Sequence, residues 1–198
     1  MAKQQDGYLS AKESRRISKE NRRITDQYEK QRKRKNVPES EYLTQMKNPE
    51  NAVEFDNLHT YFFTDTGVVK SVDGVSFEVP VGKTVGVVGE SGCGKSVTAK
   101  SIMGLIKAPQ GEIKENSEIL YHGENILKYN KKQWQHYKGG ECAIIFQDAL
   151  ASLNPTMRVG KQIMENLMGH KNMTKQEAAK EAVEMLLSLI HISEPTRH

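Results

Sequence analysis

The stretch "VGESGCGKSVTAK", residues 88–100, decides the fold of this chain. Its glycines at positions 89, 92 and 94 allow a tight turn that brings backbone N–H groups against an anion, where a side chain would collide. A helix that begins near Lys95 would add the positive end of its dipole. The pattern therefore predicts a loop that holds phosphate groups. The residues expected to contact phosphate belong to the loop and the first helical turn: Gly89, Glu90, Ser91, Gly92, Cys93, Gly94, Lys95, Ser96 and Val97.

Two side chains at the end of this loop supply its chemistry. Lys95 is a mobile point charge that can reach the β and γ phosphates of a nucleotide, and the Ser96 hydroxyl can ligate a Mg²⁺ ion that bridges them. The alternative is a glycine-rich turn that happens to precede a helix, but all eight positions of the Gly-x-x-x-x-Gly-Lys-Ser pattern match. We therefore expect the chain to bind a nucleotide together with Mg²⁺.

The flanking segments have the order that such a loop requires. Residues 52–63, "AVEFDNLHTYFF", and 67–79, "GVVKSVDGVSFEV", are rich in β-branched and aromatic residues and predict two strands, with a turn from Asp65 to Gly67. Residues 82–89, "GKTVGVVG", predict a third strand, whose continuous apolarity suits burial on both faces. Residues 97–107 have helical spacing, and Pro109 follows them.

From Val53 to Leu186 the sequence resembles the ATP-binding subunit of ABC transporters, and among these the oligopeptide and dipeptide importers. The resemblance rests on residues 58–106 and on "AIIFQDALASLNPTMRVGKQI", residues 143–163. It implies an α/β fold, the P-loop NTPase fold of ABC type with an antiparallel β subdomain, incomplete on the C-terminal side. It also implies that residues 111–126 form the family's antiparallel strand pair, and that residues 144–148, "IIFQD", form the strand leading into its Q-loop.

The resemblance implies roles for individual residues as well. ATP is the expected nucleotide, and Gln147 takes the Q-loop position, whose amide ligates Mg²⁺ or orients the attacking water, so that it acts in catalysis with Lys95. The family stacks an aromatic ring on adenine from the strand before the loop. Phe62 is the better match for this ring and Tyr61 is its neighbour, although an aromatic residue in a strand is commonly part of a core.

The same resemblance implies partners and a location. The parent protein is expected to work with a second ATP-binding subunit on transmembrane permease subunits, peripherally at the cytoplasmic face of the cell membrane, and to serve an extracytoplasmic peptide-binding protein indirectly. No nucleic acid partner is expected. Two other interpretations remain: a soluble P-loop ATPase or kinase without a membrane partner, and a non-catalytic nucleotide-binding fragment.

Three motifs that the family places after the Q-loop do not occur in this sequence: the Leu-Ser-Gly-Gly-Gln signature, the Walker B carboxylates and the switch histidine. Residues 174–186 predict a helix with Thr174 as N-cap and Glu177 three residues on. The helical pattern then breaks, and Leu187 to Arg197 resembles the translation of an adapter used in preparing sequencing libraries. The alternative is an ordinary helix end followed by a short strand. We therefore expect the chain to contain the phosphate-binding loop but to lack the catalytic half of the domain.

Composition sets the remaining limits. Residues 1–50 hold 13 lysines and arginines against 8 aspartates and glutamates, a net charge of +5. They predict a basic polar extension, a solvated helix or disordered arm, with contact to anionic lipid or nucleic acid as the alternative. Two isolated cysteines argue against a disulfide framework, and the polar start of the chain lacks the apolar core of a secretory signal. The expected division is 1–50 extension, 51–186 N-terminal part of an ABC ATP-binding domain, and 187–198 non-native tail.

Overall fold

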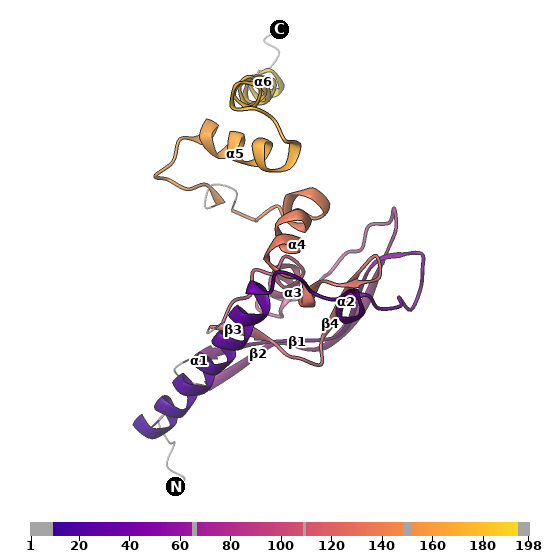
Figure 1. The fold of residues 1–198 in the computed structure, drawn as a ribbon, viewed down its shortest axis with the longest axis vertical. Helices are drawn as coiled ribbons and strands as arrows, with labels where there is room; N and C mark the ends of the chain where they lie inside the picture. Colours follow the sequence, from indigo (N-terminus) through magenta and orange to yellow (C-terminus); the bar gives the residue numbers. More distant parts are fainter. Residues whose placement is uncertain (1–9, 65–66, 109, 149–151, 194–198) are drawn as a thin grey trace. The chain divides into compact units, whose positions relative to one another are not determined.

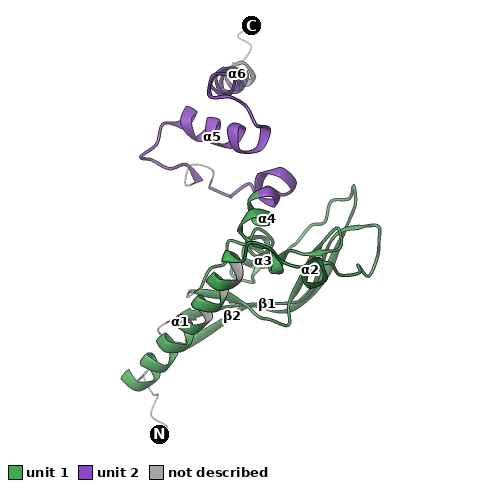
Figure 2. Ribbon diagram, in the orientation of Figure 1, with its two compact units in different colours: residues 1–135 green, residues 136–198 purple. Residues whose placement is uncertain are grey.

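The computed structural model describes residues 10–64, 67–108, 110–148 and 152–193. The chain forms two compact units, residues 1–135 and residues 136–198, and each is described by itself (Figure 2). The described elements run in chain order from α1 to α6, and the five strands lie between α2 and α4 (Figure 1). Within these described ranges, no helix combines the length and the apolarity that crossing a membrane requires.

A long antiparallel hairpin forms the frame of the first unit. β1 (Asn51–Thr64) pairs along its length with β2 (Gly67–Pro80), which confirms the two strands predicted there. Residues 65–66 of the predicted turn lie outside the described residues. Most of β1 is buried or half-buried, and Asn57 and Thr64 are its exposed residues.

The three short strands of the first unit all follow α3 (Lys95–Ile102) in the chain. β4 (Glu118–Tyr121) pairs with the first part of β1, and β3 (Gly111–Ile113) pairs with its second part. β5 (Glu124–Asn125) pairs with β4. The antiparallel strand pair predicted within residues 111–126 is present as β4 and β5. β3 and β4 also pair with different parts of β1, since that strand is long enough to accept both.

The core of the first unit joins the sheet to the short helices that follow it. Leu58 of β1 and Ile119 of β4 are fully buried, and Phe55 stacks on Phe77 of β2 with ring centroids 4.3 Å apart. Trp134, buried on α4 (Lys131–His136), packs edge to face against Tyr129. The 3-10 helix η1 (Ile126–Lys128) links the strands to this aromatic pair.

A buried carboxylate fixes the start of β1. Glu54 is 2% exposed and accepts hydrogen bonds from the backbone N–H groups of Lys47 and Asn48 and from the Asn51 side-chain amide, each 2.9 Å long. Burial alone would raise the pKa of Glu54, but these donors together outweigh burial and hold the pKa below its ordinary value. The charged side chain thereby ties the segment before β1 to the sheet.

Two helices precede the sheet. α1 (Ala11–Lys33) begins at a reciprocal cap, in which the Ser10 N–H and hydroxyl both donate to the Glu13 carboxylate and the Glu13 N–H donates to the Ser10 hydroxyl. α2 (Glu39–Tyr42) is a single turn, and Arg34 reaches it through a bidentate pair with Glu41, both bonds 2.7 Å long. The basic extension is thus helical over most of the described residues before β1.

The second unit is a helical hairpin preceded by the turn η2 (Tyr137–Glu141), in which Lys138 and Gly139 have non-helical backbone angles. α5 (Val159–Lys171) and α6 (Lys175–Ser193) pack around Leu167, Ala178 and Ala182. The predicted cap of α6 is confirmed, because the Thr174 N–H and hydroxyl each donate to Glu177 at 2.8 Å, and the Glu177 N–H donates to the Thr174 hydroxyl.

Two predicted helix ends are wrong. α3 stops at Ile102 instead of residue 107, because Gly104 turns the chain at φ +55° and lies so close to the Trp134 ring that a Cβ would be 2.7 Å from it. α6 continues past Leu186 to Ser193, since residues 187–193 contain neither glycine nor proline to end it. The non-native origin of residues 187–198 stays a prediction, which the source DNA across these codons would test.

Two predicted strands are absent from the described residues. Residues 82–89 and 144–148 have no strand and no ladder partner there, and Val88 is 92% and Ile145 is 95% exposed. Their apolar patterns suit strands with sheet neighbours on both sides. Among the described residues, neither segment joins the sheet, in which β2 is an edge strand paired with β1.

Candidate phosphate-binding site

The predicted loop leads directly into α3, as expected. Gly94 is the N-cap residue, at φ +95°, and its carbonyl accepts from the N–H of Thr98 at 2.9 Å and from the Thr98 hydroxyl at 3.1 Å. Thr98 is buried, so this double contact fixes where the helix starts. The first turn of α3 therefore presents its N–H end toward the loop.

Gly94 also sets how closely the loop approaches the sheet. A Cβ at this position would lie 2.3 Å from the carbonyl oxygen of Ser71 in β2. Ser71 falls where the hairpin register skips a residue, since Thr60 pairs with Val72 and Tyr61 pairs with Lys70. Glycine is therefore needed at position 94 for two reasons: the backbone adopts a positive φ angle there, and a side chain would collide with β2.

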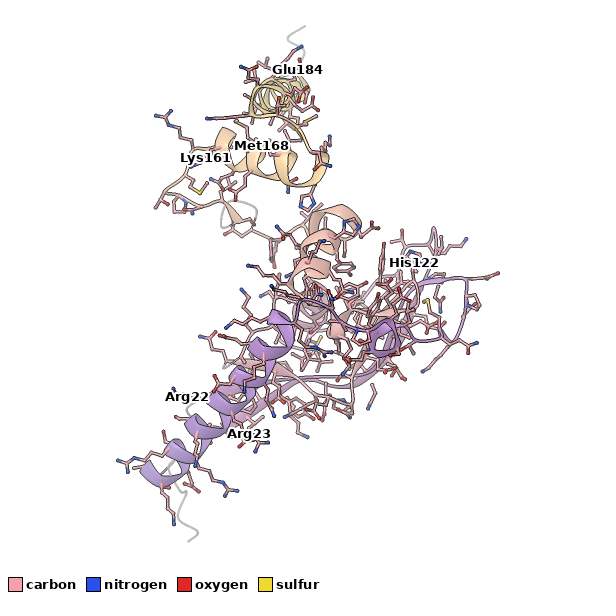
Figure 3. All side chains as sticks on the ribbon, in the orientation of Figure 1. Arg22, Arg23, His122, Lys161, Met168 and Glu184 are labelled. Atoms are coloured by element: carbon pink, nitrogen blue, oxygen red, sulfur yellow. The ribbon has the colours of Figure 1, made fainter. Side chains whose placement is uncertain are left out.

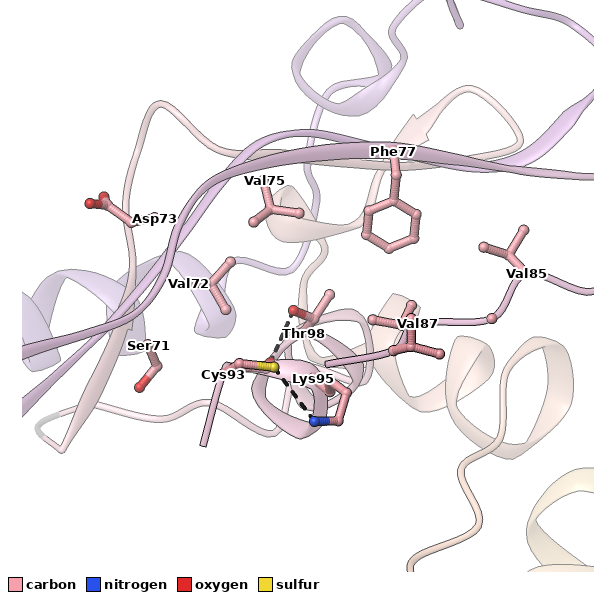
Figure 4. Close-up of a pocket in the computed structure, with 13 residues that line it drawn as sticks. Ser71, Val72, Asp73, Val75, Phe77, Val85, Val87, Cys93, Lys95 and Thr98 are labelled. Atoms are coloured by element: carbon pink, nitrogen blue, oxygen red, sulfur yellow. Dashed lines mark hydrogen bonds between the residues drawn. The ribbon is translucent and has the colours of Figure 1, made fainter. Parts of the chain in front are cut away.

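Lys95 folds back over the loop. Its Nζ donates to the carbonyl oxygens of Gly89 at 2.7 Å and Glu90 at 2.6 Å. It also lies 3.5 Å from Cys93 Sγ (Figure 4). An ammonium group has three protons, and these three contacts use them. The thiol is the weakest of the three acceptors, so it is the one that a phosphate oxygen would displace at least cost.

The loop borders a pocket of about 460 Å³ (Figure 4). β2 contributes Val72, Val75 and Phe77 to its lining, and residues 85–88 contribute a second apolar side. Its polar lining comes from Cys93, Lys95 and Thr98 at the start of α3 and from Ser71 and Asp73 of β2. Lys95, where α3 begins, is the cationic group of this lining.

The contact of the remaining loop and helix residues with an anion stays a prediction. Ser91, Gly92, Cys93 and Ser96 are exposed, and Val97 is half-buried at the first turn of α3. α3 is held to the sheet by a buried contact between the hydroxyls of Ser101 and Thr60, 3.0 Å apart. Sequence reasoning missed this contact and the approach of Gly94 to Ser71, because neither residue pair has a local signal in the sequence.

The two aromatic candidates occupy opposite faces of β1. Phe62 follows two residues after Thr60, whose hydroxyl contacts α3, and in the regular pairing with β3 the two side chains share that face. The Phe62 ring covers Gly111, where a Cβ would lie 2.9 Å from it. This arrangement favours Phe62 over Tyr61 as the ring on the side of the sheet that carries α3, and its contact with adenine stays a prediction.

Tyr61 is engaged in a polar cluster. Its hydroxyl donates to Asp73 Oδ1 at 2.5 Å, and the Lys70 and Lys114 ammonium groups each lie 5.3 Å from its ring centroid. The hydrogen bond to Asp73 and burial together raise the pKa of Tyr61. Displacing two cations and a carboxylate would be costly, so this ring is a poor platform for a base.

Gln147 belongs to the second unit, where it is exposed on the extended segment after Cys142. Cys142 itself is held through its backbone, since its N–H donates to the Tyr137 carbonyl and its carbonyl accepts from the Gly139 N–H. The predicted roles of Gln147 in binding Mg²⁺ and in catalysis stay predictions.

Comparison with known proteins places this geometry in a family. The sequence model of the ABC transporter family matches residues 72–196. The chain is 48% identical over 138 residues to the dipeptide transport ATP-binding protein DppD of Lactococcus lactis subsp. cremoris, which covers 69% of this chain and 39% of that protein.

Two further relatives have names of the same kind. The oligopeptide transport ATP-binding protein OppD of Bacillus subtilis is 45% identical over 145 residues, covering 73% of this chain and 40% of the relative. The oligopeptide transport ATP-binding protein OppD of Escherichia coli is 44% identical over 130 residues, covering 66% of this chain and 38% of the relative. The chain thus spans about two fifths of the length of these relatives. With the phosphate loop, the α3 cap and the antiparallel β subdomain in place, this chain belongs to the ABC transporter family and has part of its P-loop NTPase fold.

Proposed function

We propose that this chain is the nucleotide-binding part of a subunit that uses ATP to energise the import of oligopeptides or dipeptides through a membrane permease. The observation that carries the proposal is the loop before α3, with Gly94 packed against β2 and Lys95 drawn over the loop carbonyls. The relatives named as dipeptide and oligopeptide transport ATP-binding proteins support the class of solute.

The residues present fit the phosphates of ATP. Gly94 lets the loop pack against β2, where a side chain would meet the Ser71 carbonyl, and the helix N-terminus at Lys95 offers backbone N–H groups to an anion. Lys95 already lies in hydrogen-bond contact with the loop, so it needs only to exchange acceptors to reach a phosphate oxygen. The chain therefore provides shape, dipole and charge at one place.

A Mg²⁺ ion fits the same site through Ser96, whose side chain is exposed beside Lys95. A hydroxyl oxygen is a ligand that Mg²⁺ accepts together with phosphate oxygens and water. When bound, the ion would neutralise charge on the phosphates. Gln147 is the second proposed ligand, and it would also orient the attacking water.

The proposed partners follow from the same assignment. The chain would act at the cytoplasmic face of the membrane, beside transmembrane permease subunits and a second ATP-binding subunit, and would serve a peptide-binding protein indirectly. Disruption of the gene in its source organism should then reduce uptake of labelled peptides. Unchanged uptake of both dipeptides and oligopeptides would exclude the transport role while leaving nucleotide binding intact.

A nucleotide titration tests the central claim. The chain should bind MgATP, and Lys95→Ala should weaken that binding at least about tenfold, because a charge-assisted contact contributes about 1.5–3 kcal/mol. Lys100→Ala is the matched control, since Lys100 is an exposed lysine on the same helix and should leave the affinity unchanged. Equal affinity of the Lys95 variant and the unmodified chain would contradict the proposal.

A further inference from the structure

α1 carries a stripe of positive charge along its whole length. The helix contains nine lysines and arginines, and at 3.6 residues per turn all of them except Arg32 fall within an arc of about 120°. We call these eight residues the basic stripe. Every one of their side chains is exposed, and Figure 3 shows Arg22 and Arg23 projecting from the helix.

The acidic residues of α1 leave this stripe largely uncompensated. Asp26 is the one acidic residue within the arc, and Glu13, Glu20 and Glu29 lie outside it. Among the described residues, ion pairs join two stripe cations to acids at its edges, Arg23 to Glu20 at 4.0 Å and Lys33 to Glu29 at 2.7 Å. The stripe is therefore a cationic surface about 32 Å long, interrupted between Arg23 and Lys30, where Asp26 lies within the arc.

We propose that the basic stripe of α1 binds an anionic lipid surface and lays the helix along the membrane. A straight helix can rest on a flat surface with all eight cations within one Debye length, about 10 Å at 0.1 M salt. Each lysine or arginine near an anionic bilayer strengthens binding by roughly fivefold. The positive charge along one face of α1 therefore matches a partner whose surface is negatively charged.

Nucleic acid is the competing class of anion, and the stripe fits it less well. The arc contains no aromatic residue, because Tyr28 falls on the opposite side of the helix, so no stacking platform accompanies the charges. The choice of lipid also rests on the proposed function, which brings the chain to a membrane surface. The basic stripe lies before residue 72, outside the segment that matches the family.

Vesicle sedimentation of the full chain tests the proposal. Without nucleotide and at about 0.1 M salt, the chain should sediment with phosphatidylcholine vesicles that contain phosphatidylglycerol, and not with pure phosphatidylcholine. The stripe variant combines Lys12→Gln, Arg16→Gln, Lys19→Gln and Lys30→Gln. Its affinity for the anionic vesicles should be lower by about a hundredfold or more, because four surface cations are lost.

A control variant with the same change in net charge tests whether vesicle binding depends on the position of the cations or on the total charge of the chain. It combines Lys83→Gln, Lys107→Gln, Lys131→Gln and Lys132→Gln, four exposed lysines elsewhere in the first unit, and should bind vesicles like the unmodified chain. Circular dichroism should show equal helix content in both variants, since glutamine is a good helix former.

Three results would overturn the proposal: no binding of the unmodified chain to anionic vesicles, equal loss in the control variant, or binding to duplex DNA at the same salt without binding to vesicles. MgATP affinity measured on the same samples keeps the two proposals apart. Vesicle binding that fails while MgATP binds would refute the lipid contact alone, and the reverse would refute nucleotide binding alone.

Discussion

A single methyl group at position 94 should separate the phosphate loop from the sheet. In Gly94→Ala the new Cβ would meet the Ser71 carbonyl at 2.3 Å, and alanine would also have to adopt φ +95°. We expect a loss of about 1–3 kcal/mol in stability and a larger loss in MgATP affinity, measured by urea unfolding and by titration. In Gly160→Ala nothing lies within 4 Å of the added methyl group, so a similar loss there would show that the argument from space is wrong.

Cys93 should report nucleotide binding directly. Its side chain is exposed and its sulfur lies 3.5 Å from Lys95 Nζ, whereas Cys142 is half-buried in the second unit. MgATP should therefore slow alkylation of Cys93 and leave Cys142 unchanged, as measured by mass spectrometry of labelled peptides. Cys142 is the internal control in the same sample. If both thiols were alkylated at the same rates with and without MgATP, the result would count against a nucleotide site at Cys93.

At the scale of elements, the start of β1 depends on an ionised Glu54. The pKa of Glu54 is lower in the folded chain than its ordinary value of 4.5, so the carboxylate stabilises the fold above that pH. This stabilisation is lost as the pH falls through the folded pKa. Glu54→Gln should therefore cost about 1–3 kcal/mol at neutral pH, and the difference from the unmodified chain should shrink below pH 4.5.

Urea unfolding at a series of pH values measures this difference. Glu115→Gln, which removes an exposed carboxylate from the same unit, is the control and should change stability little at any pH. A constant difference between Glu54→Gln and the unmodified chain across the acid range would mean that the charge of Glu54 does not stabilise β1.

Elements with local signals were predictable from the sequence. The β1–β2 hairpin follows from its β-branched and aromatic residues, α6 begins at its predicted cap, and the glycine loop leads into α3 as its spacing requires. Each of these features depends on residues close together in the chain.

Elements that depend on distant partners were not predictable. The sequence did not show that β3 and β4 both pair with β1, and α3 ends early because Gly104 lies against Trp134, thirty positions further along the chain. The site shows the same limit. The loop residues could be named from the motif, but Ser71 as the surface that Gly94 approaches could not.

At the scale of the whole molecule, two apolar segments have the composition of buried strands, but no strand pairs with them among the described residues. Val85, Val87 and Val88 precede the loop, and Ile145 and Phe146 precede Gln147, and all five are exposed. The relatives extend well beyond the part that this chain matches, which spans about two fifths of their length. A continuous apolar strand is stabilised by pairing on both edges and cover on both faces. The loop of this chain is therefore held chiefly from the side of β2 and α3.

This one-sided support leads to a prediction about turnover. Lys95, Ser96 and the loop amides suffice to hold MgATP, but hydrolysis also needs a carboxylate to position water, and the sequence contains neither the Walker B carboxylates nor the signature loop that a partner subunit would receive. The purified chain should bind MgATP and release phosphate no faster than Lys95→Ala, in an assay that follows phosphate over many binding lifetimes. Steady hydrolysis that disappears in Lys95→Ala would show that residues of this chain outside the loop complete the catalytic site.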